Sequence, residues 1–401
     1  MSLLPVEHAI TKILQRVPPM QTERVALPQA AGRVLAEAMV ASHDQPPFNA
    51  SAMDGYAVRA RDAAPGASLR IIGMSQAGAG FAGVMGAGEC VRIFTGAPVP
   101  QGADAVIMQE LASVNGQHVR FAEQPQPGRS IRPMGSDFAV GQTLVEPGTR
   151  LNGLHLAVAA AANVPTLMVG RQPVIALLAT GDELVPPGSR LGADQIVASN
   201  SYGLGPLLAP YGRIVDHGIA GDDRAGLTAR LRDMFADEPD IVVTTGGASV
   251  GDHDIVQDVL VALGVTLDFW RINMRPGKPL MFGTRGKTLV FGLPGNPVSA
   301  LVTAVVFIKP ALRLWLGAGA APGRYWRLPL AAPTPPNSVR RHFMRAQLVH
   351  EETGTALRPI AEVDSGHTSS LAQADMLIVQ PEHDPGQATG TMVDAISIGQ
   401  F

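Results

Sequence analysis

The pattern of apolar positions divides the chain into segments of different character. Residues 5–17 place apolar side chains at helical spacing, and residues 151–163 return to a helical pattern. Between about residues 45 and 141, short β-prone segments alternate with Gly/Pro turns, which predicts a small β domain. If the two helical segments join, this β domain is an insertion between them.

From residue 171 to residue 317, continuous apolar strands are followed by amphipathic helices. Such strands, which lack polar alternation, are typical of a parallel sheet covered on both faces. The predicted strands are 173–180, 213–220, 240–247 and 265–273, and the predicted helices are 201–209, 223–235, 254–263 and 298–316. Residues 279–283 and 288–292 predict a hairpin before the closing helix. The last 70 or so residues, with short alternating strands and turns, predict a second small β domain.

Composition and charge narrow the class of protein. The net charge of −3 comes without a run of like charges, which argues against a nucleic-acid-binding protein. A single cysteine, Cys90, excludes an intramolecular disulfide framework and fits a reducing compartment. The N-terminus lacks the features of a signal peptide, and the longest apolar run, 298–308, is shorter than the ~20 residues that span a bilayer. We expect a cytoplasmic protein without a membrane or nucleic-acid partner.

Candidate ligand-binding residues follow the predicted strands. In open α/β sheets, ligands bind beyond the carboxyl ends of the strands. The residues at those ends include acidic, glycine-rich and basic groups: Glu183, Asp223, Gly246, Gly247, Asp254, Arg271, Arg275, Lys278 and the LPGNP segment 293–297.

The segment Thr244–Asp254, TTGGASVGDHD, has the composition of an anion-binding loop. Its two glycines let backbone N–H groups approach a ligand, and the following helix N-terminus favours phosphate. The alternative is a tight strand–helix turn in which Asp254 caps the helix. The loop alone supports both interpretations equally.

Carboxylates beside an anion site predict a bridging cation. Because carboxylates repel a phosphate, Mg²⁺ between them is the simplest resolution, and it suits phosphoanhydride cleavage. The alternative is that Asp182 and Asp223 are helix caps and that the basic residues form a solvated face. In RPGKP, 275–279, two cations flank a Pro-Gly turn and form a compact oxyanion cradle, unless the segment is a plain β-turn.

Two motifs of the N-terminal half carry little signal by themselves. Spacing alone favours a hairpin turn for Asp54-Gly55 and a simple turn for Thr95-Gly96. The histidines show no metal-ligand spacing, and no Ser/His/Asp arrangement is evident, so zinc and triad chemistry find no support.

Seven motifs in a fixed order resemble one family. They are SAMDGYAV (51–58), TGAPVPQGADAV (95–106), TGDEL (180–184), SN (199–200), TTGGASVGDHD (244–254), RPGKP (275–279) and GLPGNPVSALV (292–302). Together they resemble the MoeA family of molybdopterin molybdenumtransferases, which includes the E domain of gephyrin. The resemblance covers nearly the whole chain.

The resemblance implies an α/β multidomain fold in four parts. They are a discontinuous helical, dimerising domain (1–44 and 141–170), an inserted β domain (45–140), a three-layer α/β domain with a parallel-rich sheet like that of molybdopterin adenylyltransferase (171–320) and a C-terminal β-barrel (321–401). It also implies a homodimer. Molybdopterin adenylyltransferase and molybdoenzyme maturation proteins are further candidate partners. The implied reaction uses Mg²⁺, consumes adenylylated molybdopterin and molybdate, and releases AMP as molybdenum enters the dithiolene.

The motifs also carry over site residues. Asp54 and Thr95 are expected to face the α/β cleft of the partner subunit. Glu183, Asp223 and Asp254 are expected to serve metal and phosphoanhydride chemistry, with Asp222 as an alternative to Asp223. The expected substrate-binding residues are Asn200, Gly246, Gly247, Ser249, Arg271, Arg275, Lys278, Pro294, Pro297, Ser299, Arg345 and Ser370, of which Arg275, Lys278 and Ser299 handle molybdate with help from Arg345 and Ser370.

This sequence departs from the family pattern at three places. Arg271 and Arg275 stand where several relatives carry Lys, which replaces a point charge by a planar fork of donors. The ligand loop ends in GDHD, where relatives often have GEAD or GDYD, and the role of His253 is open.

Two other functions remain to be separated from this one. The first is another enzyme with the same α/β domain, either the adenylyltransferase or a CinA-like nucleotide pyrophosphatase, and SAMDGYAV speaks against both. The second is a non-catalytic scaffold, which could lose its acidic residues, whereas Asp54, Glu183 and Asp254 are present here.

Overall fold

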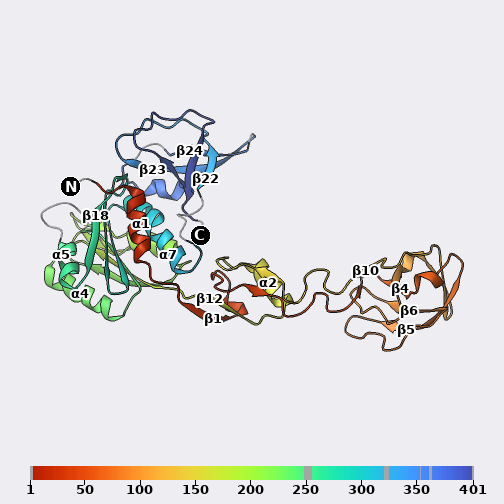
Figure 1. The fold of residues 1–401 in the computed structure, drawn as a ribbon. Coiled ribbons are helices and arrows are strands. Elements are labelled where there is room, and N and C mark those ends of the chain that lie inside the picture. The colour runs from red at the N-terminus through yellow and green to blue at the C-terminus, as the bar shows by residue number, and fades with distance from the viewer. Residues whose placement is uncertain (1–2, 248–254, 320–324, 353, 361–363, 400–401) are drawn as a thin grey trace. The chain divides into compact units, whose positions relative to one another are not determined.

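A computed structural model describes residues 3–247, 255–319, 325–352, 354–360 and 364–399. The chain forms two compact units, here called the large unit (residues 1–23 and 169–401) and the small unit (residues 24–168). Figure 1 shows the elements of both.

The small unit contains a six-stranded sheet in the order β7-β4-β6-β5-β9-β8. Its strands are β4 (Gly55–Val58), β5 (Ser68–Ser75), β6 (Glu89–Ile93), β7 (Ala105–Met108), β8 (Ala112–Asn115) and β9 (His118–Phe121). All neighbours are antiparallel except β5 and β6. Side chains from both faces of β4 are buried, with Tyr56 and Val58 in one core cluster and Ala57 in another. The prediction of a β-rich region is confirmed.

Three short strand pairs account for the remaining strands. β2 (Met39–Val40) pairs with β11 (Thr143–Val145), β3 (Ala50–Ser51) with β10 (Ile131–Arg132), and β1 (Thr22–Ala26) with β12 (Thr166–Gly170). The 3₁₀ turns are η1 (Leu27–Gln29), η2 (Ala60–Asp62) and η3 (Gln109–Leu111). One α-helix, α2 (Gly153–Ala161), lies among the described residues of this unit.

Helix α2 begins at a capping box and exposes an apolar surface. The Asn152 carboxamide oxygen accepts hydrogen bonds from the backbone N–H groups of Leu154 (3.0 Å) and His155 (3.1 Å). The sequence GLHLAVAAA is almost wholly apolar, yet only Ala159 of the helix is buried and Leu154 is 78% exposed. An apolar helix left in this state is a candidate contact surface.

The α/β region of the large unit contains a six-stranded sheet that is mixed rather than fully parallel. Its order is β16-β13-β17-β21-β20-β18. The strands are β13 (Val174–Thr180), β16 (Arg213–Ala220), β17 (Ile241–Thr245), β18 (Thr266–Arg271), β20 (Pro279–Arg285) and β21 (Thr288–Leu293). The first four in order are parallel, whereas β20 is antiparallel to both of its neighbours. The predicted hairpin therefore separates the predicted fourth strand, β18, from the others, although β18 still points in their direction.

The described residues of the large unit form six α-helices, and those from α3 onward lie where the apolar pattern predicts helices. They are α1 (Val6–Arg16), α3 (Asn200–Leu208), α4 (Arg224–Ala236), α5 (Ile255–Ala262), α6 (Pro297–Thr303) and α7 (Lys309–Trp315), with a π-helical turn, η4 (Ala304–Ile308), between the last two. Helices α4 and α5 share one core cluster with β13 and β17. The helix Pro297–Trp315 is long and apolar enough to cross a membrane, but 83% of its apolar window is buried, so it is a core helix.

The first helix belongs to the large unit, where α1 packs against α7 (Figure 1). The sequence predicts that residues 1–44 and 141–170 form one helical domain, and this division stays a prediction. In the division into two units, α1 falls in the large unit and α2 in the small unit. The apolar stripe of α1 predicts a buried face, but it does not predict which helix covers that face.

The C-terminal part of the large unit is β-rich, as the sequence predicts. Its strands are β22 (Trp326–Pro329), β23 (Arg341–Glu351), β24 (Gly354–Pro359), β25 (Met376–Gln380) and β26 (Met392–Ser397), followed in order β23-β25-β26-β22 with β24 on β23. Leu330 bridges Leu357 of β24, which brings the two edges of the sheet together. The sheet also accepts a strand from the α/β region, because β19 (Met274–Arg275) pairs in parallel with β23.

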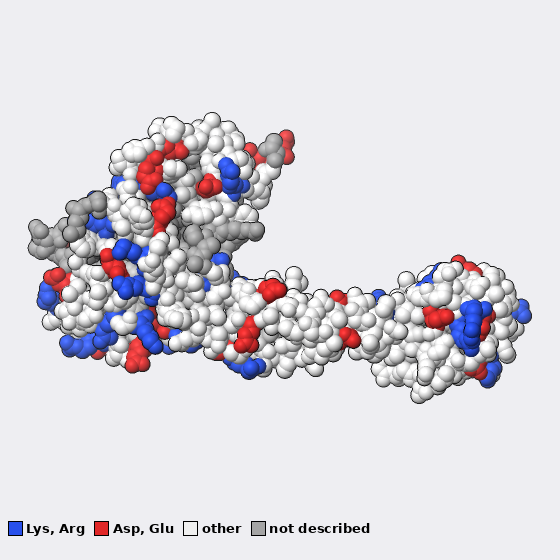
Figure 2. All heavy atoms as spheres, viewed as in Figure 1, with Lys and Arg blue, Asp and Glu red and all other residues white. Residues whose placement is uncertain are grey.

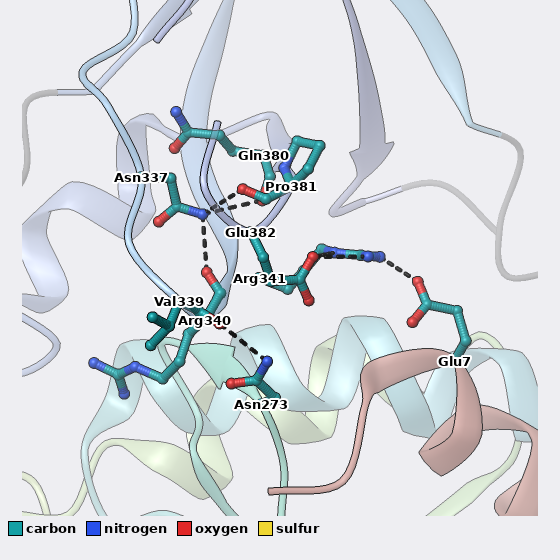
Figure 3. A network of polar contacts seen from close by, with 9 residues as sticks. All are labelled: Glu7, Asn273, Asn337, Val339, Arg340, Arg341, Gln380, Pro381 and Glu382. Atoms are coloured by element: carbon teal, nitrogen blue, oxygen red, sulfur yellow. Dashed lines mark hydrogen bonds and ion pairs between the residues drawn. The ribbon is translucent and has the colours of Figure 1, made fainter. Parts of the chain in front are cut away.

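A polar network joins this C-terminal sheet to the rest of the large unit (Figure 3). The Arg341 guanidinium donates to Glu382 Oε2, from Nε at 3.2 Å and Nη2 at 3.1 Å, and to Glu7 of α1. Asn273, next to β19, donates to the Val339 carbonyl at 3.1 Å. Three segments distant in sequence are therefore held together by directional bonds. On the face drawn in Figure 2, acidic and basic side chains are interspersed over the large unit.

Candidate functional site

A cavity of about 680 Å³ opens at the carboxyl ends of β13, β17 and β21 in the large unit. Its lining includes six of the residues predicted from the sequence, namely Glu183, Asn200, Gly246, Gly247, Pro294 and Pro297. The prediction that strand ends gather these segments is therefore confirmed for this part of the chain. The cavity forms here because parallel strands end at one edge of the sheet and leave their loops side by side.

Asp222, and not Asp223, lines the cavity beside Glu183. The Asp223 carboxylate instead caps α4, since its Oδ1 accepts a hydrogen bond from the Gly226 N–H at 2.7 Å. The capping interpretation is thus correct for Asp223. Asp182 Oδ1 accepts a bond from the Asp222 N–H at 2.9 Å and ties the loop after β16 to the loop after β13.

The third predicted acidic residue, Asp254, lies outside the described residues, as do Ser249 and His253. Among the described residues, no three His, Cys, Asp or Glu side chains come together as a metal site. Glu183 and Asp222 are the two carboxylates that the structure places in the cavity lining.

Gly246 allows a close approach between strands. Its N–H donates to the Leu293 carbonyl at 3.2 Å, so this donor is already used within the sheet. Its φ is +95°, and a Cβ there would lie 2.2 Å from the Thr180 carbonyl oxygen. Gly246 and Gly247 both line the cavity, as predicted, and their part in binding an anion stays a prediction.

The LPGNP segment is held from two sides. Asn200 Nδ2 donates to the Gly295 carbonyl at 2.8 Å, and Asn296 Nδ2 donates to Ser365 Oγ at 2.9 Å. Through Ser365 the C-terminal sheet region reaches the cavity, where Gly366 and Thr368 join the lining. Ser370 is the one residue of this segment that the sequence predicts, and the polar run SGHTSS, 365–370, is the signal that could have indicated the rest.

The predicted basic residues do not line the cavity. Arg275 lies in β19 opposite His342 of β23, and a Cβ on Gly277 would lie 2.4 Å from the Thr303 side chain. RPGKP is therefore a packed connection to the C-terminal sheet, and only its last residue, Pro279, contributes to the lining. Lys278 is half-buried, and Ser299 is buried within α6. The buried Nε of Arg271 has no hydrogen-bond acceptor among the described residues.

Arg345 and Ser370, which were predicted to act together, are in contact. The Arg345 guanidinium donates to Ser370 Oγ, and that hydroxyl donates to the His367 carbonyl at 2.7 Å. Burial lowers the pKa of the Arg345 guanidinium. Ser370 lies in η5 (Thr368–Gln373), which begins at the cavity-lining residue Thr368. This turn packs on β23, the strand that carries Arg345.

In the small unit, Asp54 and Thr95 form a directly bonded pair. Asp54 Oδ1 accepts from the Thr95 N–H at 2.7 Å and from the Thr95 hydroxyl at 2.8 Å. These two bonds, aided by the charge of Arg92, lower the pKa of Asp54. The Asp54-Gly55 hairpin predicted from spacing is wrong, because Gly55 begins β4, which pairs with β6 and β7. A turn does contain Gly96, whose φ is +82°.

Comparisons with known proteins cover the chain in three consecutive blocks. The family models that match are the MoeA N-terminal region, domains I and II (residues 4–163), a probable molybdopterin-binding domain (176–314) and the MoeA C-terminal region, domain IV (327–398). The match of the first and last blocks distinguishes the chain from proteins that share only the α/β domain.

Individual relatives agree with these models. The molybdopterin molybdenumtransferase of Haemophilus influenzae is 37% identical over 77% of this chain and 77% of its own length. Gephyrin from Dictyostelium discoideum is 31% identical over 99% of this chain and 62% of its own. The crystal structure of a molybdopterin biosynthesis MoeA protein from Pyrococcus horikosii has a TM-score of 0.85 at 30% identity, with complete coverage of both chains. The chain therefore belongs to the MoeA family of molybdopterin molybdenumtransferases, which acts in molybdenum cofactor biosynthesis and is related to gephyrin.

Proposed function

We propose that this protein cleaves adenylylated molybdopterin with the help of a divalent cation, releases AMP and inserts molybdate into the dithiolene. In this reaction water attacks the phosphoanhydride, so that AMP leaves and molybdopterin keeps its own phosphate. The observation that carries the proposal is the cavity of about 680 Å³ with Glu183 and Asp222 in its lining. It is large enough for a nucleotide-sized ligand and carries two carboxylates at the carboxyl edge of the sheet.

The donors in the cavity fit a hard cation such as Mg²⁺. Carboxylate and amide oxygens are the ligands that Mg²⁺ prefers, and it keeps several waters when few protein ligands are available. Glu183 and Asp222 would hold the ion, and the buried Asn200 Oδ1 has no hydrogen-bond partner in the described structure. The ion would supply positive charge to the phosphate oxygens. Asp254 remains a third candidate from the sequence.

Hydrogen bonds between residues of this chain fix the walls of the cavity. Asp182 fixes the backbone beneath Asp222, while Asn200 and Asn296 fix the LPGNP segment through Gly295 and Ser365. These bonds pre-organise two sides of the cavity before a ligand binds, which lowers the cost of ordering on binding. Molybdate is assigned by the resemblance to Arg275, Lys278 and Ser299, assisted by Arg345 and Ser370.

The proposal includes a homodimer in which Asp54 and Thr95 serve the partner subunit's cleft. Helix α2 supports self-association, because its apolar Leu154 and Val158 are 78% and 37% exposed. A cytoplasmic location is part of the same proposal, supported by the burial of the single cysteine, Cys90, as a free thiol. Molybdopterin adenylyltransferase, as the supplier of the substrate, and molybdoenzyme maturation proteins remain proposed partners.

The test is AMP release by the purified protein from adenylylated molybdopterin with Mg²⁺ and molybdate. We expect turnover that stops on chelation of Mg²⁺ and falls in Glu183→Gln. Formation of adenylylated product from ATP and molybdopterin would instead identify an adenylyltransferase. Light scattering tests the dimer, since a monomer would remove the cross-subunit role of Asp54.

A further inference from the structure

Arg92 of β6 is held in a fixed orientation in the small unit by two aromatic rings. Its guanidinium carbon lies 4.7 Å from the centroid of the Phe94 ring and 5.1 Å from that of Tyr56. Tyr56 is also its partner across the β4–β6 ladder. A guanidinium stacked in this way retains its charge but loses freedom to move, because the ring faces attract the cation.

The same guanidinium is linked to the backbone at Asp54 and Gly55, directly and through Gln109. Arg92 Nη1 donates to the carbonyl of Gly55, the residue after Asp54, at 2.8 Å. Arg92 Nη2 donates to Gln109 Oε1 at 2.5 Å, and the Gln109 backbone N–H in turn donates to the Asp54 carbonyl at 3.0 Å. The planar fork of arginine thus reaches the segment that carries Asp54 along two separate routes.

These contacts complete a frame around the Asp54 carboxylate. Thr95 occupies Oδ1 with two hydrogen bonds, and Arg92 fixes the backbone that presents the carboxylate. The backbone of Gly55 approaches β7 closely, since a Cβ there would lie 1.9 Å from the Ile107 carbonyl oxygen. Among the described residues no hydrogen bond reaches Oδ2, which leaves this oxygen available to a ligand.

We propose that Arg92 is a positioning residue for Asp54, acting through Gly55 and Gln109 to aim the carboxylate. This rests on the proposed function of Asp54. It assigns a role to a side chain that belongs to none of the motifs of the sequence analysis. The competing explanation is that Arg92 only stabilises the sheet, in which case its loss would lower stability without changing the state of Asp54.

The experiment compares Arg92→Met with Arg70→Met in the full-length protein. Methionine keeps an apolar stem against the two rings and removes the charge and both donors. Arg70 is a matched control on neighbouring β5, where its side chain is 57% exposed and pairs with Glu89. Two measurements are made. The kinetics of AMP release give kcat and KM, and NMR follows the titration of the Asp54 carboxyl in protein carrying ¹³C-labelled aspartate. The Asp54 resonance is assigned by its absence from Asp54→Asn.

We expect Arg92→Met to lower kcat about tenfold or more with little change in KM, because a displaced catalytic group affects the transition state most. The pKa of Asp54 should rise in the same variant, since a favourable charge is lost. Compared with Arg92→Met, Arg92→Lys should restore most of the lowering of the Asp54 pKa, because the positive charge is kept. It should restore only part of kcat, because one ammonium cannot bond both acceptors. Gln109→Ala, which removes one of the two routes, should lower kcat by a smaller factor.

The proposal is overturned if Arg92→Met matches Arg70→Met in both kcat and the Asp54 titration. Should Arg92→Met fail to fold, Arg92→Lys and Gln109→Ala carry the same two measurements, and wild-type values in both would again overturn it. Failure of the proposed function gives a different result: Asp54→Asn would then keep the wild-type rate of AMP release, while the Asp54 titration would still report whether Arg92 acts on that carboxyl.

Discussion

The two units hold their acidic residues by different means. In the large unit, Glu183 and Asp222 follow parallel strands, and the topology of the sheet brings their loops to one cavity. In the small unit, Asp54 precedes a strand of a mainly antiparallel sheet, its carboxylate accepts two hydrogen bonds from Thr95, and Arg92 donates to the carbonyl of the next residue, Gly55. A position set by topology depends on the backbone of several strands, whereas a position set by contacts depends on a few replaceable side chains.

The first way to test this comparison is to disturb the backbone of the small unit through Gly55→Ala. The added Cβ would lie 1.9 Å from the Ile107 carbonyl oxygen, so β4 and β7 must separate. We expect a loss of about 4 kcal/mol or more, the range of severe backbone and packing conflicts. Cys90, buried in this sheet with its pKa raised to about 12, becomes reactive only when the small unit opens. Thiol labelling therefore measures the effect.

The tryptophans provide the control for that experiment. Trp270, Trp315 and Trp326 all lie in the large unit. Their fluorescence should report an unchanged unfolding transition in Gly55→Ala while Cys90 labelling accelerates. If the tryptophan transition shifts together with the faster labelling of Cys90, the two units do not unfold independently.

The next largest effect is expected in the cavity, where Asp222 and Asp223 form a matched pair. Asp222→Asn should lower the rate of AMP release about 100-fold, as expected on losing a charged group at a metal or phosphate site. Asp223→Asn should stay within about threefold, because asparagine caps a helix as well as aspartate does. Equal loss in both variants, or loss in Asp223→Asn alone, would return the catalytic assignment to Asp223.

A smaller effect is expected from Arg341→Met, which removes the guanidinium between Glu7 and Glu382 (Figure 3). We expect the large unit to lose about 1–2 kcal/mol, since the bonds are partly shielded from water. The control is Arg327→Met, whose ion pair with Asp394 joins side chains that are 71% and 55% exposed. Tryptophan-monitored denaturation distinguishes the two, and equal stabilities would show that the network does not fasten the C-terminal sheet.

The smallest effect concerns the ionisation of Asp54. Hydrogen bonds from Thr95 favour the charged carboxylate, so they lower the pKa of Asp54, and the stabilisation is lost as pH falls through that lowered value. Thr95→Val removes the hydroxyl bond and keeps the backbone bond. The pKa of Asp54 should therefore rise part of the way to its ordinary value, while Thr95→Ser should leave it unchanged. Carboxyl titration by NMR checks both variants. If the pKa of Asp54 is unchanged in Thr95→Val, the backbone bond alone is sufficient to lower it.

Much of the large unit could be predicted because local sequence patterns indicate its strands and helices. The predicted strand 213–220 coincides with β16, and the predicted helix 223–235 differs from α4 by one residue at each end. Strand ends also predicted the neighbourhood of Glu183, Asn200 and Gly247. What the apolar pattern could not predict was that the predicted hairpin places β20 between β21 and β18, since the composition of a buried strand does not indicate which strands lie beside it.

The remaining differences arise from long-range contacts. Asp222 and Asp223 are adjacent and chemically equal, and only the capping bond to Gly226 decides which one turns away. Ser365 is distant in sequence from Asn296, and no local pattern encodes their bond. The helical stripe of α1 likewise leaves its partner open. Local signals identify surfaces, whereas the tertiary fold decides what covers them.

Strand β19 affects how this protein could exchange parts during evolution. Its two residues, Met274 and Arg275, are encoded within the α/β segment but complete the edge of the C-terminal sheet beside Arg341 and His342. A recombination event that replaced only the residues from β22 onward would bring in a sheet whose receiving edge had been selected with a different strand. We therefore expect substitutions in the C-terminal region to be accompanied by substitutions in RPGKP.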